Sequence, residues 1–136
     1  MALNLKISSE AAQAEATSGL SSLFDGGSIR FYSGTQAASA DTAIGAQILS
    51  AEVVLPTPAM SAVSGILTAN TLSAVSILSS TTVSWYRCVG ATTTLTICDG
   101  SVGTTAGAFN CVVNDTAFVA SAELTISSFV HTIVRE

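Results

Sequence analysis

Few residues of this sequence are able to act as an acid, a base or a nucleophile. His131 is its one histidine, and it falls in a segment with strand periodicity, where a histidine more often sits at the surface or rim than in a catalytic centre. Enzymatic catalysis needs a positioned acid, base or nucleophile, and the many serines include no G-x-S-x-G motif. The sequence therefore predicts no catalytic residue, and we do not expect an enzyme.

The acidic residues have positions that favour turns rather than ligand sites. Asp25, Asp41, Asp99 and Asp115 each stand beside a predicted turn, where an aspartate side chain hydrogen-bonds to nearby backbone amides. A calcium loop needs several oxygen ligands at tight spacing, such as D-x-D-x-D-G, and the sequence has no such motif. The fragment Gly100–Gly103 is too short for a phosphate-binding loop, and no lysine follows it. We therefore expect no metal and no cofactor.

The three cysteines leave two alternatives open. The spacings from Cys88 to Cys98 and from Cys98 to Cys111 match no zinc motif, and one histidine does not complete a ligand set. An odd number of cysteines without a secretory signal argues against a disulfide framework. A hairpin centred near residues 104–105 would place Cys98 opposite Cys111, so a cross-strand bridge is geometrically possible. The other alternative is that all three are buried thiols that pack as small apolar side chains.

The elements that position these residues belong to a chain with little charge. Charged residues make up 10% of its 136 residues, against about 25% in a typical soluble domain. Four Lys and Arg residues and a net charge of −5 cannot neutralise many phosphates, which argues against nucleic-acid binding. The hydrophobic fraction of 49% argues against intrinsic disorder. Such a chain either coats its surface with Ser and Thr or buries that surface against other subunits, which suits a component of a large assembly.

The uncharged run from Val53 to Tyr86 does not predict a membrane span. A spanning helix needs roughly 20 mostly apolar residues, whereas Pro56, Pro58 and many hydroxyl residues interrupt this run. The N-terminus has no basic segment followed by an apolar core. We therefore expect no signal peptide, and synthesis in a cytoplasm.

The N-terminal unit, residues 1–27, is predicted to be an extended arm followed by a helix. Leu3, Leu5 and Ile7 alternate with polar residues, which indicates a short strand. That strand either adds to a neighbour's sheet, which makes these three residues interface candidates, or pairs within its own chain. Residues 9–24 have the apolar spacing of a helix, and the Asp-Gly-Gly sequence that follows tolerates positive φ and ends it.

Residues 28–136 are predicted to be the β domain of one compact unit. Short strands rich in Val, Ile, Thr and aromatic residues, at spacings of roughly 8 to 12 residues, are typical of a sandwich or barrel. The expected strands are 28–33, 46–55, 65–74, 81–88, 93–98, 109–113, 117–119 and 123–134. We expect turns over 56–64, at Asp99-Gly100 and at Gly103, and a bulge near Ser127–Ser128. The predicted fold is mainly β: an antiparallel β-sandwich, jelly-roll or Ig-like, with one N-terminal helix and the arm.

Alternation also assigns side chains to the faces of these strands. Over 28–33, Ile29 and Phe31 share one face, and Arg30 and Tyr32 share the other. The next expected strand has a longer set of residues in phase, namely Leu49, Ala51, Val53 and Leu55.

Trp85, Tyr86 and Arg87 form the densest aromatic cluster. Alternation places Tyr86 and Cys88 on one face of their strand and Trp85 and Arg87 on the other. A Trp and an Arg on an outward face are typical of residues that dominate protein interfaces, which makes both of them interface candidates. The alternative is that Trp85 fills a core and Arg87 stacks over it.

Four blocks of the sequence match a pattern of turn glycines and core strands. Gly26-Gly27 and Ile29–Thr35 follow G-G-x-L-[RK]-[IF]-Y-[ST]-G-T with Ile29 at the Leu position, and Ala37 stands where a proline is expected soon after. Trp85–Arg87 fits W-[FY]-R, and Asp99–Thr104 fits [DQ]-G-[ST]-V-G-T, with a serine-rich final strand behind it. Over nearly its whole length the chain resembles small proteins encoded in the structural modules of tailed bacteriophages.

The resemblance implies a virion protein, namely a head decoration or cement protein. Such proteins bind outside the capsid lattice, often as homotrimers at three-fold positions, and lock capsid subunits together. The implied partners are the major capsid protein and further copies of this chain, with no nucleic acid and no membrane. The implied location is the capsid surface of the virion, after synthesis in the host cytoplasm. The alternative is a tail or fibre module that binds a receptor, for which a cleft with exposed aromatic and carboxylate side chains is expected.

Overall fold

Alternating apolar residues build a fold that is mainly β, with one ten-stranded sheet and one two-stranded sheet in its described part. The computed structural model describes residues 5–8, 19, 21–63, 66–92 and 95–132. The elements in chain order are β1 (Lys6–Ile7), the 3-10 turn η1 (Ser21–Phe24), β2 (Ser28–Ser33), β3 (Leu49–Val54), β4 (Met60–Val63), β5 (Ile66–Ala69), β6 (Val75–Ser76), β7 (Thr81–Val89), β8 (Thr96–Gly103), β9 (Cys111–Val113), β10 (Ala117–Phe118), β11 (Glu123–Leu124) and β12 (Ile126–Thr132).

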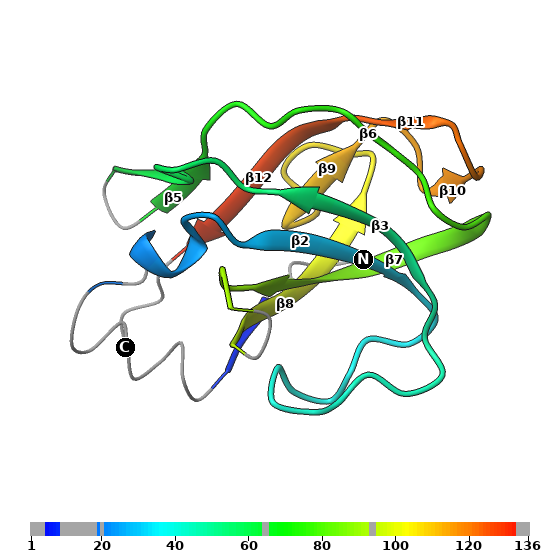
Figure 1. Cartoon of the computed structure of the whole chain (residues 1–136), viewed down its shortest axis with the longest axis horizontal. Helices are drawn as coiled ribbons and strands as arrows, with labels where there is room; N and C mark the ends of the chain where they lie inside the picture. The colour runs from blue at the N-terminus through cyan, green and yellow to red at the C-terminus, as the bar shows by residue number, and fades with distance from the viewer. Residues whose placement is uncertain (1–4, 9–18, 20, 64–65, 93–94, 133–136) are drawn as a thin grey trace.

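The large sheet is mixed and curled (Figure 1). Its strands follow the order β3-β2-β7-β8-β9-β12-β5-β4, with β1 beside β8 and β10 beside β7, while β11 and β6 form the small sheet. Among the described strands, the β8–β9 pairing is parallel and the others are antiparallel. The curl gives a half-barrel. The prediction of a mainly β fold is therefore confirmed, whereas the antiparallel sandwich is not.

Strand β2 has the bounds that alternation predicts. Ile29 and Phe31 lie in the main core, and Tyr32 packs with Trp85 on the opposite face. Because β2 pairs with both β3 and β7, it is an inner strand with neighbours along both edges. The period-two prediction for this strand is confirmed.

Strand β3 changes phase near its start. Ala51 lies in the main core as expected, but Leu49 packs against the cluster of Tyr32 and Trp85 on the opposite face. The register with β2 shifts at this point, where Ser50 is the extra residue on the β3 side. One extra residue reverses the direction of the side chains that precede it. The prediction that Leu49 shares a face with Ala51 was wrong for this reason.

Strand β8 runs through one of two predicted turns and ends at the other. Asp99 and Gly100 lie inside it, so the turn expected there is wrong, whereas Gly103 is its last residue and the chain turns directly after it. After β8 the chain returns to lie parallel to it as β9. Asn110 joins the connection between the two strands to β8. Its Oδ1 accepts hydrogen bonds from the backbone N–H of Ser101 at 3.2 Å and from the Ser101 hydroxyl at 3.1 Å.

The C-terminal segment contains the predicted bulge. The register of β12 with β9 shifts between Ile126 and Ser128, and Leu124 and Phe129 are buried on either side of that shift. The single strand expected there is divided before this bulge into β11, which pairs with β6, and β12. The turn expected over 56–64 is also shorter than predicted, because β4 forms within it.

The predicted helix over 9–24 lies outside the described residues, apart from Gly19 and the segment Ser21–Phe24. That segment is a 3-10 turn. Phe24 is fully buried at its end, and its ring meets the ring of His131 edge-on with centroids 5.8 Å apart. The turn η1 therefore packs onto the last strand of the sheet.

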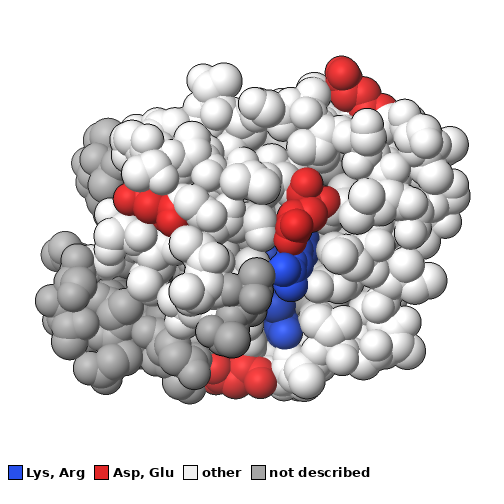
Figure 2. Space-filling model, in the orientation of Figure 1, with Lys and Arg blue, Asp and Glu red and all other residues white. Residues whose placement is uncertain are grey.

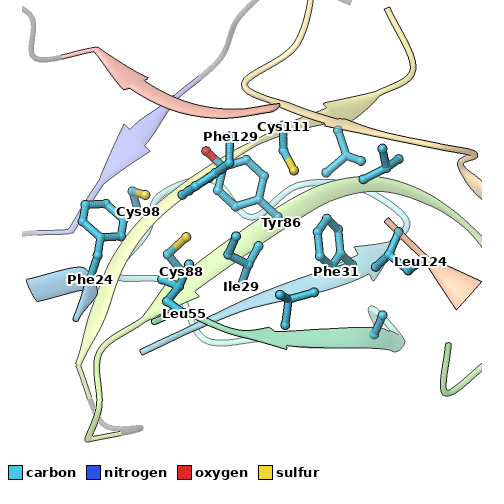
Figure 3. Close-up of a cluster of buried hydrophobic side chains, with 14 of the residues drawn as sticks. Phe24, Ile29, Phe31, Leu55, Tyr86, Cys88, Cys98, Cys111, Leu124 and Phe129 are labelled. Atoms are coloured by element: carbon cyan, nitrogen blue, oxygen red, sulfur yellow. The ribbon is translucent and has the colours of Figure 1, made fainter. Parts of the chain in front are cut away.

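One apolar core fills the inside of the curl (Figure 3). Its largest fully buried side chains include Tyr86, Phe24, Phe31, Phe129 and Ile29. A smaller cluster of Tyr32, Ala37 and Trp85 is separate from this core. No helix in the described part of the chain has the length and apolar character needed to cross a membrane.

Candidate functional site

The pairing of β7 with β8 places the chemically active side chains on two faces of one strand pair. In this register Arg87 is opposite Asp99, and Cys88 is opposite Cys98. Successive residues of a strand point to opposite faces of the sheet, so the ion pair and the thiol pair lie back to back. We call the side of Arg87 and Asp99 the outer face, and the side of Cys88 and Cys98 the inner face.

On the outer face, Arg87 and Asp99 form a buried, two-pronged ion pair. The Arg87 Nε donates to Oδ1 of Asp99 at 2.7 Å, and Nη2 donates to Oδ2 at 2.8 Å. Arg87 also reaches the loop between β2 and β3, since Nη1 donates to the carbonyl of Thr42 at 2.8 Å and Nη2 to that of Ser39 at 3.3 Å. Fork-shaped pairs of this kind are the stronger hydrogen bonds of proteins. The pair therefore holds the loop against β7.

Trp85 lies beside this ion pair. Its ring stacks on Tyr32 with centroids 4.9 Å apart, and the Arg87 Cζ lies 5.6 Å from its centroid, within the range of a cation–π interaction. Lys6 of β1 adds a contact from the other side, because its Nζ donates to the carbonyl of Ala38 at 3.1 Å. Strands β7 and β1 therefore both hold the loop that covers the outer face.

Burial raises the pKa of Asp99 above its ordinary value, because removal from water disfavours the charged carboxylate. Hydrogen bonds and charge from Arg87 act in the opposite direction. Both carboxylate oxygens accept from the guanidinium, which is the geometry of an ionised pair. Each charge is tolerated in the interior only because its partner is present.

On the inner face, Cys88 and Cys98 share the core with His131. Figure 3 shows both sulfur atoms directed into the same interior, near the ring of Phe24. Cys88 and His131 are the neighbours that lower the pKa of the Cys98 thiol. His131 is buried, and its Nδ1 has no hydrogen-bond partner among the described residues.

Tyr86 extends across the same interior from β7. Its ring lies over Gly100, where an added Cβ would collide with the phenol, and meets Phe129 edge-on at 5.2 Å. Its hydroxyl is buried without a partner in the described part of the chain. Burial raises the pKa of Tyr86 well above its usual range, so this phenol is protonated at neutral pH.

The three thiols differ in acidity because their neighbours differ. The hydrogen bond from Cys88 lowers the pKa of Cys98 to about 7 against the opposing effect of burial, and His131 lowers it further through a hydrogen bond and its charge. Burial raises the pKa of Cys88, and its hydrogen bond to Cys98 raises it further. Burial also raises the pKa of Cys111. Cys98 is therefore the thiol that ionises first.

We expect the free energy of unfolding to pass through a maximum in mildly alkaline solution. An unfolded cysteine has a pKa of about 8.5. Between pH 7 and about 8.5 the folded chain has released the Cys98 proton that the unfolded chain still holds, so stability rises with pH. Above that range the raised pKa values of Cys88 and Cys111 have the opposite effect, and stability falls.

Urea unfolding of the reduced protein over a series of pH values measures this dependence. In Cys98→Ala the rise should vanish while the fall at higher pH remains. A wild-type profile that is flat from neutrality to about pH 8.5 would contradict the ionisation assigned to Cys98.

Of the two alternatives for the cysteines, the structure has the buried thiols. The cross-strand neighbour of Cys98 is Cys88, whereas Cys111 has Val102 and Phe129 as register partners. The hairpin expected after Cys98 does not form, because β9 runs parallel to β8. Cys98 and Cys111 are therefore not bridged, and all three cysteines are buried free thiols.

The interface candidates lie in several environments. Trp85 and Arg87 are 1% and 5% exposed, so the structure has the alternative in which Trp85 is packed inside and Arg87 stacks over it. Leu3 lies outside the described residues, Leu5 packs against the main core, and Ile7 pairs with β8. Of the two alternatives for the arm, the structure has the pairing within the chain.

Asp99 and His131 are the two site residues whose environments were not predicted correctly from the sequence. The sequence predicts a turn at Asp99 and a surface or rim position for His131, and both side chains are buried. A signal for the first was present: Arg87 and Asp99 are equally distant from residue 93, so a hairpin centred there brings opposite charges together. His131 meets groups from β8 and η1, and no local pattern encodes those contacts.

A hollow of about 500 Å³ lies along the loop between β2 and β3. Its lining consists of small and polar residues, namely Ser33, Gly34, Thr35, Gln36, Ala37, Ala38, Thr42, Ala43, Gly45, Ala46 and Gln47. This lining has no aromatic ring and no carboxylate. Within the described ranges no three His, Cys, Asp or Glu side chains are grouped so that they could hold a metal ion.

The two faces differ in what they can do chemically. The outer face holds a loop in place through an ion pair, and the inner face holds an ionisable thiol beside a second thiol and an imidazole.

No protein-family model, curated protein or solved structure matches this chain.

Proposed function

We propose that this chain is a structural protein of a virus particle, a head decoration protein that binds the outer capsid surface and stabilises contacts between major capsid subunits. The shortage of charge on its surface carries the proposal. Figure 2 shows a face of the molecule on which charged side chains are few and mostly far apart. A small domain that stays free in solution devotes about 25–35% of its surface to Lys, Arg, Glu and Asp.

The cations of the described chain are all engaged within the molecule. Arg87 is buried with Asp99, Arg30 pairs with Glu52 at 2.5 Å, and Lys6 binds a loop carbonyl. Little positive charge is left to attract phosphates, which supports the absence of a nucleic-acid partner. Uncharged surface of this kind favours contact with other proteins.

Three exposed apolar side chains indicate where a protein partner would fit. Ile48, Leu78 and Val119 are 50%, 60% and 59% exposed, and we call them the apolar rim. Their segments are joined, because the Leu78 N–H donates to the Ser50 carbonyl at 2.8 Å and the segment of Val119 hydrogen-bonds to Ile77. Burial of apolar surface stabilises a complex by about 25 cal/mol per Å² before the entropic cost of association. A bound copy would then add to shell stability by mass action.

The blocks that carry the phage resemblance have structural roles in this fold. Gly27 lies against the backbone of Val89, and Gly103 lies against the ring of Phe109. None of these four residues offers a reactive group, which supports a scaffold role. The resemblance further supports a homotrimer on the capsid surface, made in the host cytoplasm, with no membrane partner.

Immunogold labelling of intact particles tests the proposed location. We expect gold over the head at regular density. Gold on the tail would overturn head decoration and support the tail or fibre module, although the hollow beside β2 has none of the aromatic or carboxylate groups that a glycan site needs. Particles without label would overturn both functions.

A surface variant tests whether the apolar rim forms the contact. Leu78→Glu is expected to lower the affinity for purified, undecorated heads at least about tenfold, because a charge replaces an apolar contact. Thr105→Glu adds the same charge in an exposed turn after β8 and should bind like the wild type. Thermal unfolding checks that both variants fold. If the wild type, Leu78→Glu and Thr105→Glu bind the heads equally, then the apolar rim does not form the contact with the capsid.

A further inference from the structure

We propose that Cys88 and Cys98 are a dithiol that hydrogen peroxide converts into a disulfide between β7 and β8. This modification site is independent of the proposed function. It rests on the register of two neighbouring strands, on the direction of two sulfur atoms and on an adjacent imidazole.

The backbone already has the spacing that a disulfide needs. Cys88 and Cys98 are direct partners in an antiparallel pair, where opposite Cα atoms lie about 4.5–5.5 Å apart. Disulfides join residues whose Cα atoms are about 4.4–6.8 Å apart. Both side chains point to the inner face (Figure 3), and each thiol shifts the pKa of the other. The bond can therefore form without moving the strands.

Cys111 is excluded from this pair by its position. It belongs to β9, where it is in register with Val102 and Phe129 rather than with either of the other cysteines. Figure 3 shows it beyond the rings of Tyr86 and Phe129. The dithiol is therefore specific, although three buried thiols share one core.

His131 is the positioning residue of the pair. It lowers the pKa of Cys98, and the ring of Phe24 meets its imidazole edge-on. At neutral pH Cys98 is partly a thiolate, since its pKa is about 7, and the thiolate is the nucleophile in cysteine oxidation. The other titratable groups that act on this core are Cys88 and Tyr86 from β7, Asp99 from β8 and Cys111 from β9.

The reaction balances with peroxide as the oxidant. The Cys98 thiolate attacks one peroxide oxygen, the O–O bond breaks, and the released hydroxide takes a proton to become water. Cys98 is then a sulfenic acid. The Cys88 sulfur attacks the Cys98 sulfur, the S–O bond breaks, and hydroxide leaves with the Cys88 proton as a second water. In total, two thiols and one peroxide give one disulfide and two waters.

Full burial selects a small oxidant. Both sulfur-bearing residues are 0% exposed, so the oxidant must enter during brief local opening of the core. Hydrogen peroxide is close to water in size, whereas a disulfide reagent such as oxidised glutathione is many times larger. We expect peroxide to oxidise the native protein at least tenfold faster than oxidised glutathione at the same concentration.

Peptide mapping of the peroxide-treated native protein tests the proposal. No Lys or Arg lies between Arg87 and Arg135, so trypsin leaves all three cysteines in one peptide. Chymotrypsin cleaves after Leu95 and Phe109 and separates them. The reaction is stopped with an alkylating agent in denaturant, and the map is made without reduction. We expect a mass loss of two hydrogen atoms and a peptide pair that links Cys88 to Cys98.

Matched variants separate the roles of the three cysteines. Cys111→Ala should oxidise like the wild type. Cys88→Ala should stop at a sulfenic acid on Cys98, which dimedone labels after denaturation. Cys98→Ala should be oxidised at least tenfold more slowly than the wild type. A disulfide that includes Cys111, a product only between two molecules, or native protein that stays reduced while unfolded protein oxidises would each overturn the proposal.

The pH profile of the reaction tests the role of His131. In the wild type the oxidation rate should rise with a midpoint near pH 7, as the pKa of Cys98 is about 7. In His131→Phe, which retains a ring against Phe24, the midpoint should move to higher pH. A residue with a purely structural role would change the rate without moving the midpoint, so an unmoved midpoint would overturn the role of His131.

Discussion

Asp99→Ala is expected to lower the free energy of unfolding by about 3–5 kcal/mol, because it leaves the buried guanidinium of Arg87 without its partner. The Arg87 and Asp99 side chains are 6% and 0% exposed, so water cannot replace the lost carboxylate. Urea unfolding measures the change. Trp85 is the one tryptophan of the chain and lies 5.6 Å from the guanidinium, so its fluorescence should also shift as the covering loop loosens.

A surface ion pair provides the matched control. Arg30 and Glu52 also form a salt bridge, but their side chains are 26% and 36% exposed. Glu52→Ala should therefore change the free energy of unfolding by no more than about 1 kcal/mol. The double variant Arg87→Met with Asp99→Leu should recover much of the stability that Asp99→Ala loses, since no unpaired charge remains. Equal losses in Asp99→Ala and Glu52→Ala would show that the Arg87 pair is not sealed from water.

Gly27→Ala is expected to destabilise the fold by about 1–3 kcal/mol or more, as overpacking of an interior does. An added Cβ would collide with the carbonyl oxygen of Val89 and lie 3.2 Å from the Cα of Gly90. These are backbone atoms at the end of β7, held by the pairing of Ser28 with Val89, so they cannot move aside as a flexible side chain can.

Gly45→Ala makes the same chemical change where there is space. The nearest atom to its added Cβ is the Gln47 Oε1 at 3.6 Å, an ordinary contact. We expect a change within about 0.5 kcal/mol. Thermal unfolding of both variants gives the comparison. If the two variants have the same melting temperature, then β2 and β7 are not packed as closely at this point as the structure has them.

The period-two alternation of side chains is sufficient to predict the bounds of a strand whose two faces pack in different surroundings. The bounds of Ser28–Ser33 and the start of β7 follow from it, because each strand buries one set of side chains in the main core and another set elsewhere. The phase of Leu49 does not follow, since the bulge at Ser50 depends on the partner strand β2. Local pattern therefore predicts elements better than the register between them.

The candidate site was predictable only in part, because its residues depend on distant partners. Asp-Gly is a turn sequence by local preference, yet Asp99 and Gly100 lie within a strand, where Arg87 supplies the opposite charge and the ring of Tyr86 covers the glycine. The parallel return to β9 rests on hydrogen bonds between Ser101 and Asn110. No composition or periodicity encodes either arrangement.

The shortage of charge was visible in the sequence, whereas its spatial distribution was not. Composition predicts a surface poor in ions, but the apolar rim needs Ile48, Leu78 and Val119 to come from three segments that hydrogen-bond to one another. In the same way, composition counts three thiols, and only the register reveals that Cys88 and Cys98 face each other.

The pairing of β1 with β8 affects how the chain is made. Lys6 pairs with Asp99, and the Ser8 N–H donates to the Ile97 carbonyl at 3.0 Å, so β1 binds a strand that is synthesised much later. At about 5–20 residues per second of translation, β1 waits for several seconds or longer before its partner exists. A nascent chain that stops before β8 has no closed sheet and exposes apolar strand edges, so we expect a stalled or truncated product to need a chaperone or to aggregate.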